Sequence, residues 1–182
     1  MTEVIYTERL IIRPILLSDY DNWLDSQNNR LPSQYKHDDG FKDISGHNFE
    51  WFKEYIEECS FLASEDKIRV FGIFDKESST YIGLIDVITL SRANVDWAEI
   101  GYSINNQYWK NGYAYEAVSA FIPYLKDDLK FSRIDAVVSI DNIPSKNLLK
   151  KLSFSYECVR KEFIYEFGKW ADQDVFYINL HD

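Results

Sequence analysis

The sequence has few residues of the kinds that bind metals or form disulfides. Among its 182 residues are 2 cysteines and 3 histidines. Cys59 and Cys158 form no CxxC motif, so a reduced protein of the cytoplasm is the simplest expectation, with a single disulfide left open as the alternative. His37, His47 and His181 lack the spacing of metal ligands, and we expect no metal site.

Long apolar runs are also missing. No stretch approaches the roughly 18 consecutive apolar residues of a membrane span. The segment Met1–Ile5 has neither the basic region nor the apolar region of a secretory signal. We therefore expect no membrane partner and a cytoplasmic location.

Positive charge is the third scarcity. The chain has 20 Lys and Arg against 30 Asp and Glu, a formal net charge of −10. This balance argues against binding a phosphate backbone, so no direct nucleic-acid binding is expected, and it is compatible with a basic substrate or partner. Aromatic residues make up 16% of the chain, which excludes a disordered acidic tail. The length predicts one domain over residues 1–182.

The first half of the chain predicts strands interleaved with helices. Ser18-Asp19-Tyr20-Asp21 resembles a capping box and predicts a short helix. A second helix is expected over His47–Ser60, with Phe49, Phe52, Ile56 and Cys59 on one face. The polar segment Asn28–Gly46 between them is either a lid or substrate wall or a plain surface loop. Strands are expected over Glu8–Ile15, Ile68–Asp75, Tyr81–Leu90 and Trp97–Ile104.

The second half begins with the strongest helical pattern in the chain. Apolar residues from Ala114 to Leu125 recur with helical spacing, and Pro123 within them predicts a kink or an early end. Pro144 suits the first turn of another helix. Further strands are expected over Arg133–Ile140, Ser155–Phe167 and Asp174–Leu180. The helix between Trp97–Ile104 and Arg133–Ile140 predicts a parallel crossover, and hence an α/β fold with a mixed, largely antiparallel sheet.

The junction between strand Trp97–Ile104 and the helix that begins near Ala114 suits an anion. Backbone N–H groups at a helix start are unpaired and lie at the positive end of the helix dipole, which favours phosphate or pyrophosphate. Gly112 permits close backbone approach. The segment has neither GxGxxG nor the Gly-Lys-Ser/Thr of a P-loop, and an ordinary strand–loop–helix junction is the alternative.

Ala98-Glu99-Ile100-Gly101-Tyr102, followed by the run from Tyr108 to Ala117, resembles the acetyl-CoA signature of the GNAT N-acetyltransferase superfamily. The resemblance is greatest to the branch that contains the ribosomal-protein N-terminal acetyltransferases. Segments in the same order along the chain agree: Thr7–Pro14, Tyr81–Gly83, Asp141–Ser145, Leu152–Glu157, Gly168–Asp172 and Phe176–Tyr177.

The resemblance implies a GNAT-like sheet of about seven strands, with helices on both faces and a splayed central parallel strand pair. It implies acetyl-CoA as co-substrate, with its pyrophosphate held by backbone N–H groups around Lys110–Ala114 and its pantetheine arm paired with backbone in the splay. Lys110 either adds charge there or is a solvated lysine. The residues implied in cofactor binding are Tyr102, Ser103, Ile104, Tyr108, Trp109, Lys110, Asn111, Gly112, Tyr113, Ala114, Asn142 and Ser145.

Two residues are candidates for the chemistry. Glu99 lies opposite the apolar face of its strand, and its carboxylate can accept the proton of an amine, directly or through water; the alternative is an exposed strand glutamate. Ser145 aligns with a family serine near the CoA sulfur and can donate a hydrogen bond to the leaving thiolate. Simple helix capping is the alternative for Ser145 and for Asn142.

The expected activity is direct transfer of acetyl to a primary amine in a ternary complex. The acceptor is either a protein N-terminal α-amine or a small amine, such as a polyamine, an aminoglycoside or an amino-acid derivative. The alternative function is a non-catalytic acyl-CoA-binding or regulatory module on the same fold. A homodimer is the default assembly for a soluble protein.

Overall fold

In the computed structural model, which describes residues 3–181, the described chain forms an eight-stranded sheet and four α-helices. Met1 and Thr2, part of the segment considered for a secretory signal, lie outside the described residues. The strands are β1 (Ile5–Tyr6), β2 (Leu10–Pro14), β3 (Ile68–Asp75), β4 (Tyr81–Ser91), β5 (Trp97–Ile104), β6 (Arg133–Ser139), β7 (Ser155–Glu166) and β8 (Lys169–Asn179). The helices are α1 (Tyr20–Asn28), α2 (Phe49–Ser64), α3 (Tyr113–Asp127) and α4 (Ile143–Lys151).

The sheet is mixed, with the strand order β1-β2-β3-β4-β5-β6-β8-β7. Neighbouring strands are mostly antiparallel, and β5 pairs with β6 in parallel, so the predicted mixed sheet and crossover are confirmed. The chain divides into two compact units. The first runs up to Ile88 and includes Tyr102–Phe121, and the second comprises Thr89–Gly101 and the residues from Ile122 onward. The assignment of residues 1–182 to one domain stays a prediction.

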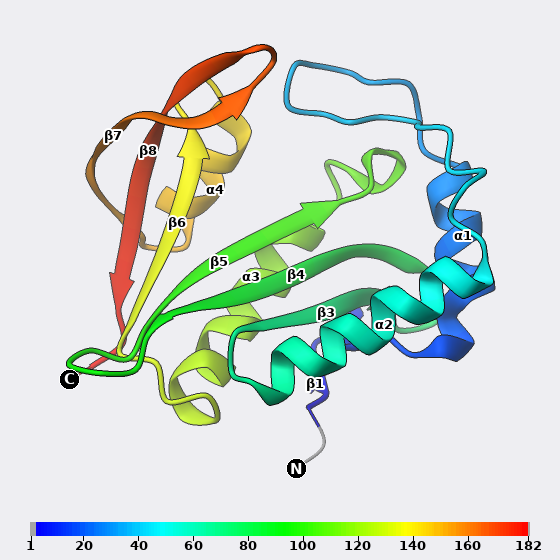
Figure 1. Cartoon of the computed structure of the whole chain (residues 1–182), viewed down its shortest axis with the longest axis horizontal. Coiled ribbons are helices and arrows are strands. Elements are labelled where there is room, and N and C mark those ends of the chain that lie inside the picture. Colours follow the sequence, from blue (N-terminus) through cyan, green and yellow to red (C-terminus); the bar gives the residue numbers. More distant parts are fainter. Residues whose placement is uncertain (1–2, 182) are drawn as a thin grey trace. The chain divides into compact units, whose positions relative to one another are not determined.

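The first unit is an antiparallel meander whose two faces carry different helices. Helix α2 runs along β3 (Figure 1), and Val70 of β3 packs in an apolar cluster around Phe52 and Phe74. The adjacent Phe71 instead packs edge-on against Phe121 of α3, with ring centroids 5.1 Å apart. Successive strand residues point to opposite faces of a sheet, so α2 and α3 cover opposite faces, as expected.

The ends of the first two helices differ from the sequence prediction. A 3₁₀ turn precedes α1, and the capping carboxylate there belongs to Asp19, which accepts a hydrogen bond from Leu16 N (2.8 Å) and pairs with Arg13 (2.7 Å). Helix α2 begins after Asn48, whose side chain accepts a hydrogen bond from the backbone of Trp51. Several capping groups compete for the start of a helix, and the structure shows that Asp19 and Asn48 are the ones used here.

Helix α3 corrects a prediction about its proline. It continues past Pro123 to Asp127, so of the expected kink or early end, the early end does not occur. Apolar side chains on both sides of the proline are fully buried, including Phe121 and Leu125. Burial of these side chains offsets the cost of an interior proline, which is about 3 kcal/mol.

The second unit is centred on β6. The parallel register of β5 with β6 runs from the pair Trp97–Arg133 to the pair Glu99–Asp135, and β8 pairs with β6 along the other edge. Strand β8 begins at Lys169, earlier than expected, because it pairs with nearly the whole length of β7. This arrangement places Glu99 at the last recorded pair of the parallel ladder.

The backbones of β4 and β5 approach closely at Gly83 in the first unit, which explains why glycine stands there and predicts an effect on stability. A Cβ on Gly83 of β4 would overlap the carbonyl oxygen of Ser103 and lie 2.9 Å from Cα of Ile104, both in β5. Gly83→Ala should lower the free energy of unfolding by about 2 kcal/mol, the cost of overpacking a rigid contact. Urea denaturation measures this loss. Gly46→Ala is the matched control because its Cβ would meet nothing within 4 Å, and equal effects of the two substitutions would contradict the explanation.

Candidate functional site

The loop before α3 has the geometry of an anion site. Lys110 and Gly112 adopt positive φ angles of 65° and 80°, and Lys110, Asn111 and Gly112 are exposed. The first helical hydrogen bond of α3 runs from Glu116 N–H to the Gly112 carbonyl (3.1 Å), so the preceding N–H groups of the first turn have no partner within the helix. The loop therefore places backbone N–H groups at a positive helix end.

Two side chains that the resemblance assigned to cofactor binding hold the loop in shape. The Trp109 indole N–H donates to the Ile104 carbonyl at 2.6 Å, which ties the loop to the end of β5. The Asn111 amide donates to the carbonyls of Tyr108 (3.0 Å) and Trp109 (3.3 Å). Because these groups bond within the loop, they favour a scaffolding role for both side chains, and the anion contacts fall to the backbone.

A clasp from the N-terminal segment, formed by Thr7, Arg9 and Glu116, fixes the first turn of α3. The Glu116 carboxylate accepts hydrogen bonds from Thr7 Oγ1 (2.6 Å), Arg9 N (2.9 Å) and Arg9 Nε (2.7 Å). Burial opposes ionisation of Glu116, but the hydrogen bonds from Thr7 and Arg9 outweigh it, so the pKa of Glu116 lies below its ordinary value. Glu116 therefore anchors the helix start to the segment before β2.

The same arginine reaches the loop itself. Arg9 Nη1 donates to the carbonyl of Asn111 at 2.9 Å, and the guanidinium lies over the ring of Tyr113, 4.7 Å from its centroid. A Cβ on Gly112 would lie 3.6 Å from Arg9 Nη2. Arg9 thus supports the turn that presents the backbone donors. Sequence reasoning missed this role, for which the only signal was the resemblance of Thr7–Pro14 to the opening strand of the family.

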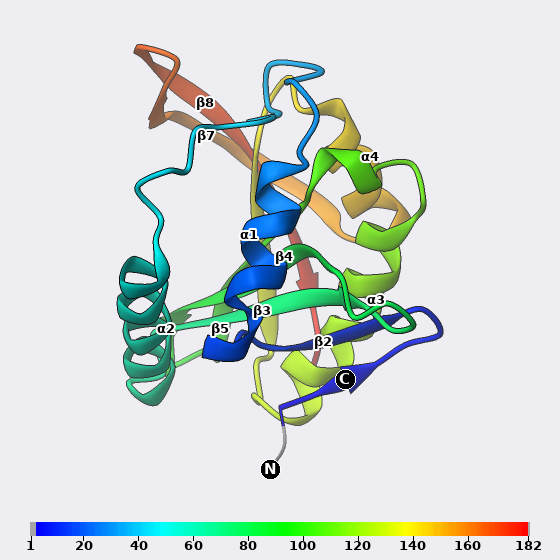
Figure 2. The ribbon, with the colours of Figure 1, turned by 90° about the vertical axis from the view of Figure 1, so that its right-hand side faces the viewer.

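The long segment between α1 and α2 is bound to the short turn that follows β5. The contact is made through the buried carboxylate of Asp38 and the side chain of Asn106. The Asp38 side chain is fully buried, accepts hydrogen bonds from Gly40 N (2.9 Å) and Asn106 Nδ2 (3.1 Å), and lies 3.6 Å from Arg30. Asn106 Oδ1 also accepts from Leu31 N at 2.8 Å. Figure 2 shows this segment as the long blue-to-cyan connection from α1 to α2. Its polar anchors would suit a substrate wall held in place.

The remaining predicted residues of the first unit lie along the end of β5 and the turn after it. Ile104 is buried, Ser103 is exposed, and Tyr102 and Tyr108 are half-buried. Ala114 is half-buried at the start of α3. Together with the loop, these residues form one continuous stretch, as the resemblance implied.

In the second unit, Glu99 faces charged partners. Its Oε2 lies 3.7 Å from Nη1 of Arg160 on β7, and both side chains are about one quarter exposed (26% and 27%). Its strand neighbours Ala98 and Ile100 are buried. The predicted alternation is therefore confirmed, and Glu99 is an accessible carboxylate beside a guanidinium.

Asn142 and Ser145 lie at the start of α4. Asn142 is the N-cap, and its side chain accepts a hydrogen bond from the backbone N–H of Ser145 at 3.3 Å. Pro144 occupies the first turn of the helix, as expected. The capping interpretation of Asn142 is confirmed, and the hydrogen bond comes from the backbone of Ser145.

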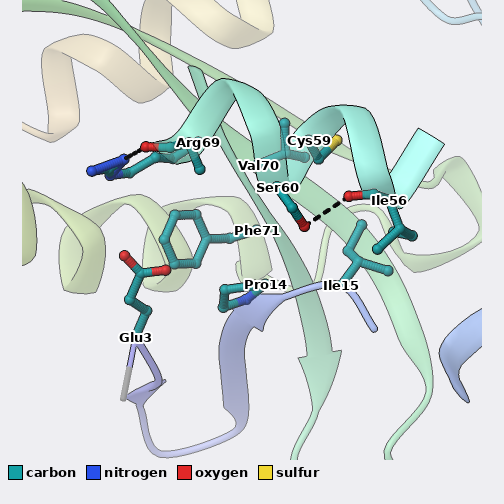
Figure 3. A pocket seen from close by; sticks show the side chains of 10 residues that line it. Glu3, Pro14, Ile15, Ile56, Cys59, Ser60, Arg69, Val70 and Phe71 are labelled. Atoms are coloured by element: carbon teal, nitrogen blue, oxygen red, sulfur yellow. Dashed lines mark hydrogen bonds between the residues drawn. The ribbon is translucent and has the colours of Figure 1, made fainter. Parts of the chain in front are cut away.

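A separate cavity in the first unit lies between α2, β2 and β3. It measures about 260 Å³, and Figure 3 shows Ile15, Cys59, Ser60 and Phe71 among the side chains that line it. The Ser60 hydroxyl donates to the Ile56 carbonyl at 2.8 Å. Burial raises the pKa of the Cys59 thiol, which makes it a poor nucleophile.

Within residues 3–181, no group of three or more His, Cys, Asp or Glu side chains is placed to hold a metal ion. Cys59 and Cys158 are both free thiols in this structure. None of the helices in the described part of the chain is long and apolar enough to cross a membrane.

Comparison with known proteins identifies the family. Residues 9–155 match the family model described as the acetyltransferase (GNAT) domain. The chain is 32% identical over 178 residues to the protein named uncharacterized N-acetyltransferase p20 in Bacillus licheniformis, covering 98% of this chain and 96% of that protein. It is 30% identical over 102 residues to the [ribosomal protein uS5]-alanine N-acetyltransferase of Escherichia coli, covering 56% and 53% of the two chains.

A solved structure shares the fold. Mycobacterium smegmatis RimJ, in complex with CoA-disulfide, superposes with a TM-score of 0.79 at 18% identity and covers 94% of this chain and 82% of its own. The family model spans most of the chain, and the p20 protein aligns over nearly all of it. The chain therefore belongs to the GNAT family and is an acetyltransferase enzyme.

Proposed function

We propose that the protein is an acetyl-CoA-dependent N-acetyltransferase that moves acetyl directly to a primary amine in a ternary complex. The observation that carries the proposal is the exposed loop before α3, where Lys110 and Gly112 turn with positive φ. Such a loop fits a pyrophosphate because its backbone donors need no side-chain cation. When bound, acetyl-CoA supplies the acetyl group as a thioester.

The residues that would hold the co-substrate are those of the loop and of β5. The backbone of Lys110–Ala114 would bind the pyrophosphate, and the backbone of Tyr102–Ile104 would pair with the pantetheine arm. Asn142 is assigned to the same arm by the resemblance. The side chains of Trp109 and Asn111 contribute by keeping the loop in shape.

Glu99 is the proposed base. An amine attacks a carbonyl only as the neutral species, and an α-amino group has a pKa of roughly 7.7–8.0, whereas lysine has one of about 10.4. The Glu99 carboxylate is about one quarter exposed and can therefore receive the amine proton, directly or through one water. No activated nucleophile is proposed. Isolation of an acetylated enzyme that passes its acetyl group to the amine would contradict direct transfer.

Ser145 is the proposed donor to the leaving sulfur. Ser145→Ala should lower kcat about tenfold and leave the KM for acetyl-CoA nearly unchanged, because the hydroxyl acts on charge that develops during transfer. Steady-state kinetics checks both values. The substitution keeps the backbone N–H that Asn142 caps, so this N-cap hydrogen bond should remain. An unchanged kcat would leave Ser145 with a purely local role in α4.

The acceptor is proposed at the level of a primary amine. The net charge of −10 suits a cationic amine. The relative from Escherichia coli is named for an alanine of ribosomal protein uS5, which makes a protein N-terminal α-amine one candidate. Small amines are the other.

A turnover assay tests the function and separates these candidates. Release of CoA would be followed over a panel of ribosomal-protein N-terminal peptides, polyamines, aminoglycosides and amino-acid derivatives. Turnover with one class identifies the acceptor. Thermal stabilisation by acetyl-CoA without turnover on any amine, and without an effect of Glu99→Gln, would instead show a non-catalytic acyl-CoA-binding module.

A further inference from the structure

A continuous chain of charges crosses β7, β6 and β5 in the second unit. From its outer end, Glu157 pairs with Arg133 at 2.7 Å, and Arg133 Nε donates to Asp135 Oδ1 at 2.7 Å. Arg160 then lies 3.7 Å from Asp135 Oδ2 and 3.7 Å from Glu99 Oε2. Acids and arginines alternate along the chain, and its inner end is the carboxylate proposed as the base.

Asp135 is the member of this chain whose burial is least favourable for stability. Its side chain is 1% exposed, although it carries a carboxylate in the middle of β6. Oδ1 is satisfied by Arg133, but Oδ2 is buried and finds no hydrogen-bond donor within residues 3–181. A buried charge without compensation is strongly destabilising. The Arg160 guanidinium, 3.7 Å from this oxygen, supplies a compensating positive charge.

Arg160 is shared between two carboxylates. It lies at the same distance from Glu99 and Asp135, slightly too far to hydrogen-bond to either. Its guanidinium also lies 4.9 Å from the ring centroid of Phe163, which restrains it from the other side. Since Glu99 and Asp135 are directly paired in the parallel ladder, their side chains leave the sheet on one face.

The chain of charges that ends at Glu99 draws its other members from three strands. Strand β6 brings Asp135 and Arg133, and β7 brings Arg160 and Glu157. Strand β8 contributes the phenol of Tyr177, over which the Arg133 guanidinium lies at 4.5 Å. Asp135 disfavours a negative charge on Glu99 and Arg160 favours it, and of these two Arg160 is the member paired directly with Glu99.

We propose that Arg160, held by Asp135, is a positioning residue that orients Glu99 and sets its proton affinity. The role in transfer rests on the proposed function of Glu99 as the base. In that step the amine N–H bond breaks, its proton bonds to a Glu99 carboxylate oxygen, and the electron pair stays on nitrogen. Glu99 becomes neutral, and the Arg160 charge remains balanced by Asp135. The guanidinium therefore keeps a partner in both protonation states of the base.

The first test measures proton affinity without any turnover. The carboxyl carbon of Glu99 would be titrated by ¹³C NMR in glutamate-labelled protein, with the Glu99→Gln spectrum assigning the signal. In Arg160→Gln the pKa of Glu99 should rise by about 1 pH unit, because the charge that favours the ionised form is gone. Arg160→Lys should restore most of the difference. An unchanged titration in Arg160→Gln overturns the proposal.

The second test measures the acid limb of kcat/KM against pH. If Glu99 is the base, the limb should move to higher pH in Arg160→Gln by the same amount as the NMR titration. If the NMR titration moves and the limb does not, Arg160 still controls Glu99, and the assignment of Glu99 as base is wrong. The NMR titration therefore tests the role of Arg160, and the pH profile tests the assignment of Glu99 as the base.

Two further variants serve as controls, one for misfolding and one for the loss of any nearby cation. Arg160→Gln leaves the buried Asp135 carboxylate without its guanidinium, so the double variant Arg160→Gln with Asp135→Asn removes both charges. Its Glu99 pKa should lie below that of Arg160→Gln, because the repulsion from Asp135 is lost together with the attraction of Arg160. A Glu99 pKa that is no lower in the double variant than in Arg160→Gln would contradict the proposal. Lys161→Gln removes a neighbouring cation of β7 that pairs only with Asp172 among the contacts recorded for the described chain, and it should move neither measurement.

Discussion

Replacing Glu99 with glutamine should lower kcat/KM about 10²- to 10⁴-fold at neutral pH, the usual contribution of a general base. Glutamine keeps the size of the side chain and removes its ability to accept a proton. The variant should recover activity as pH rises toward and past the amine pKa, because solvent then supplies the neutral amine. Steady-state kinetics from about pH 6 to 10 measures both effects, because this range brackets the pKa values of α-amino groups and most of the titration of lysine.

The control for Glu99→Gln is a substitution of Glu157, the carboxylate at the other end of the charge chain. Glu157→Gln removes a carboxylate of the same network, paired with Arg133 and 40% exposed, and should leave kcat/KM within about twofold of the wild-type value. Calorimetry should show the same affinity for acetyl-CoA in both variants. Equal losses of activity in Glu99→Gln and Glu157→Gln would point to a structural effect and against a base at Glu99.

Replacing Arg9 with methionine should raise the KM for acetyl-CoA by up to about a hundredfold, with a much smaller change in kcat. Arg9 joins the Asn111 carbonyl to the Glu116 carboxylate, and its loss frees the loop that presents the backbone donors. Displacement of binding groups by about 1 Å costs up to a hundredfold in comparable sites. Initial rates at varied acetyl-CoA concentration give the two constants.

Lys76→Met is the matched control for that prediction. Lys76 donates to the Thr7 carbonyl at 3.1 Å and so contacts the same N-terminal segment. No contact with the loop is recorded for it in the described part of the chain, and its substitution should leave the KM for acetyl-CoA unchanged. A normal KM in Arg9→Met would mean that the loop keeps its shape without the clasp.

The clasp also predicts a pH dependence of stability. The pKa of Glu116 is lowered in the folded protein, so its contribution is fully present above its ordinary value of 4.5 and is lost as pH falls through the lower, folded value. In Glu116→Gln this acid-side loss should disappear. Denaturation curves recorded below and above pH 4.5 compare the two proteins.

Much of the fold was predictable because it depends on neighbours along the chain. The apolar spacing between Ala114 and Leu125 predicts α3, and Pro144 marks the start of α4. The end of α3 was not predictable, since burial on both sides of Pro123 outweighs the local penalty. The short strand β1 was missed as well, because two residues carry no periodic signal.

In the candidate site too, the features that depend on neighbours along the chain were predicted and the long-range contacts were not. The loop from Tyr108 to Ala114 and the N-cap at Asn142 were found from the sequence, since a glycine, a helix start and a capping side chain act within a few residues. The supports of the loop were not found. Asp38 and Asn106 meet across 68 residues of sequence, and no local pattern announces such a contact.

By itself the sequence determined the GNAT fold, the anion loop and the choice of Glu99 as a strand carboxylate, because periodicity, turn chemistry and the family signature are all local in the chain. Only the tertiary structure decided which charges meet. Arg9 reaches Glu116 over 107 residues, and Arg160 reaches Glu99 from a different strand. The physical reason is that an ion pair depends on separation in space, and strand order, which brings distant residues together, is set by the packing of the whole sheet.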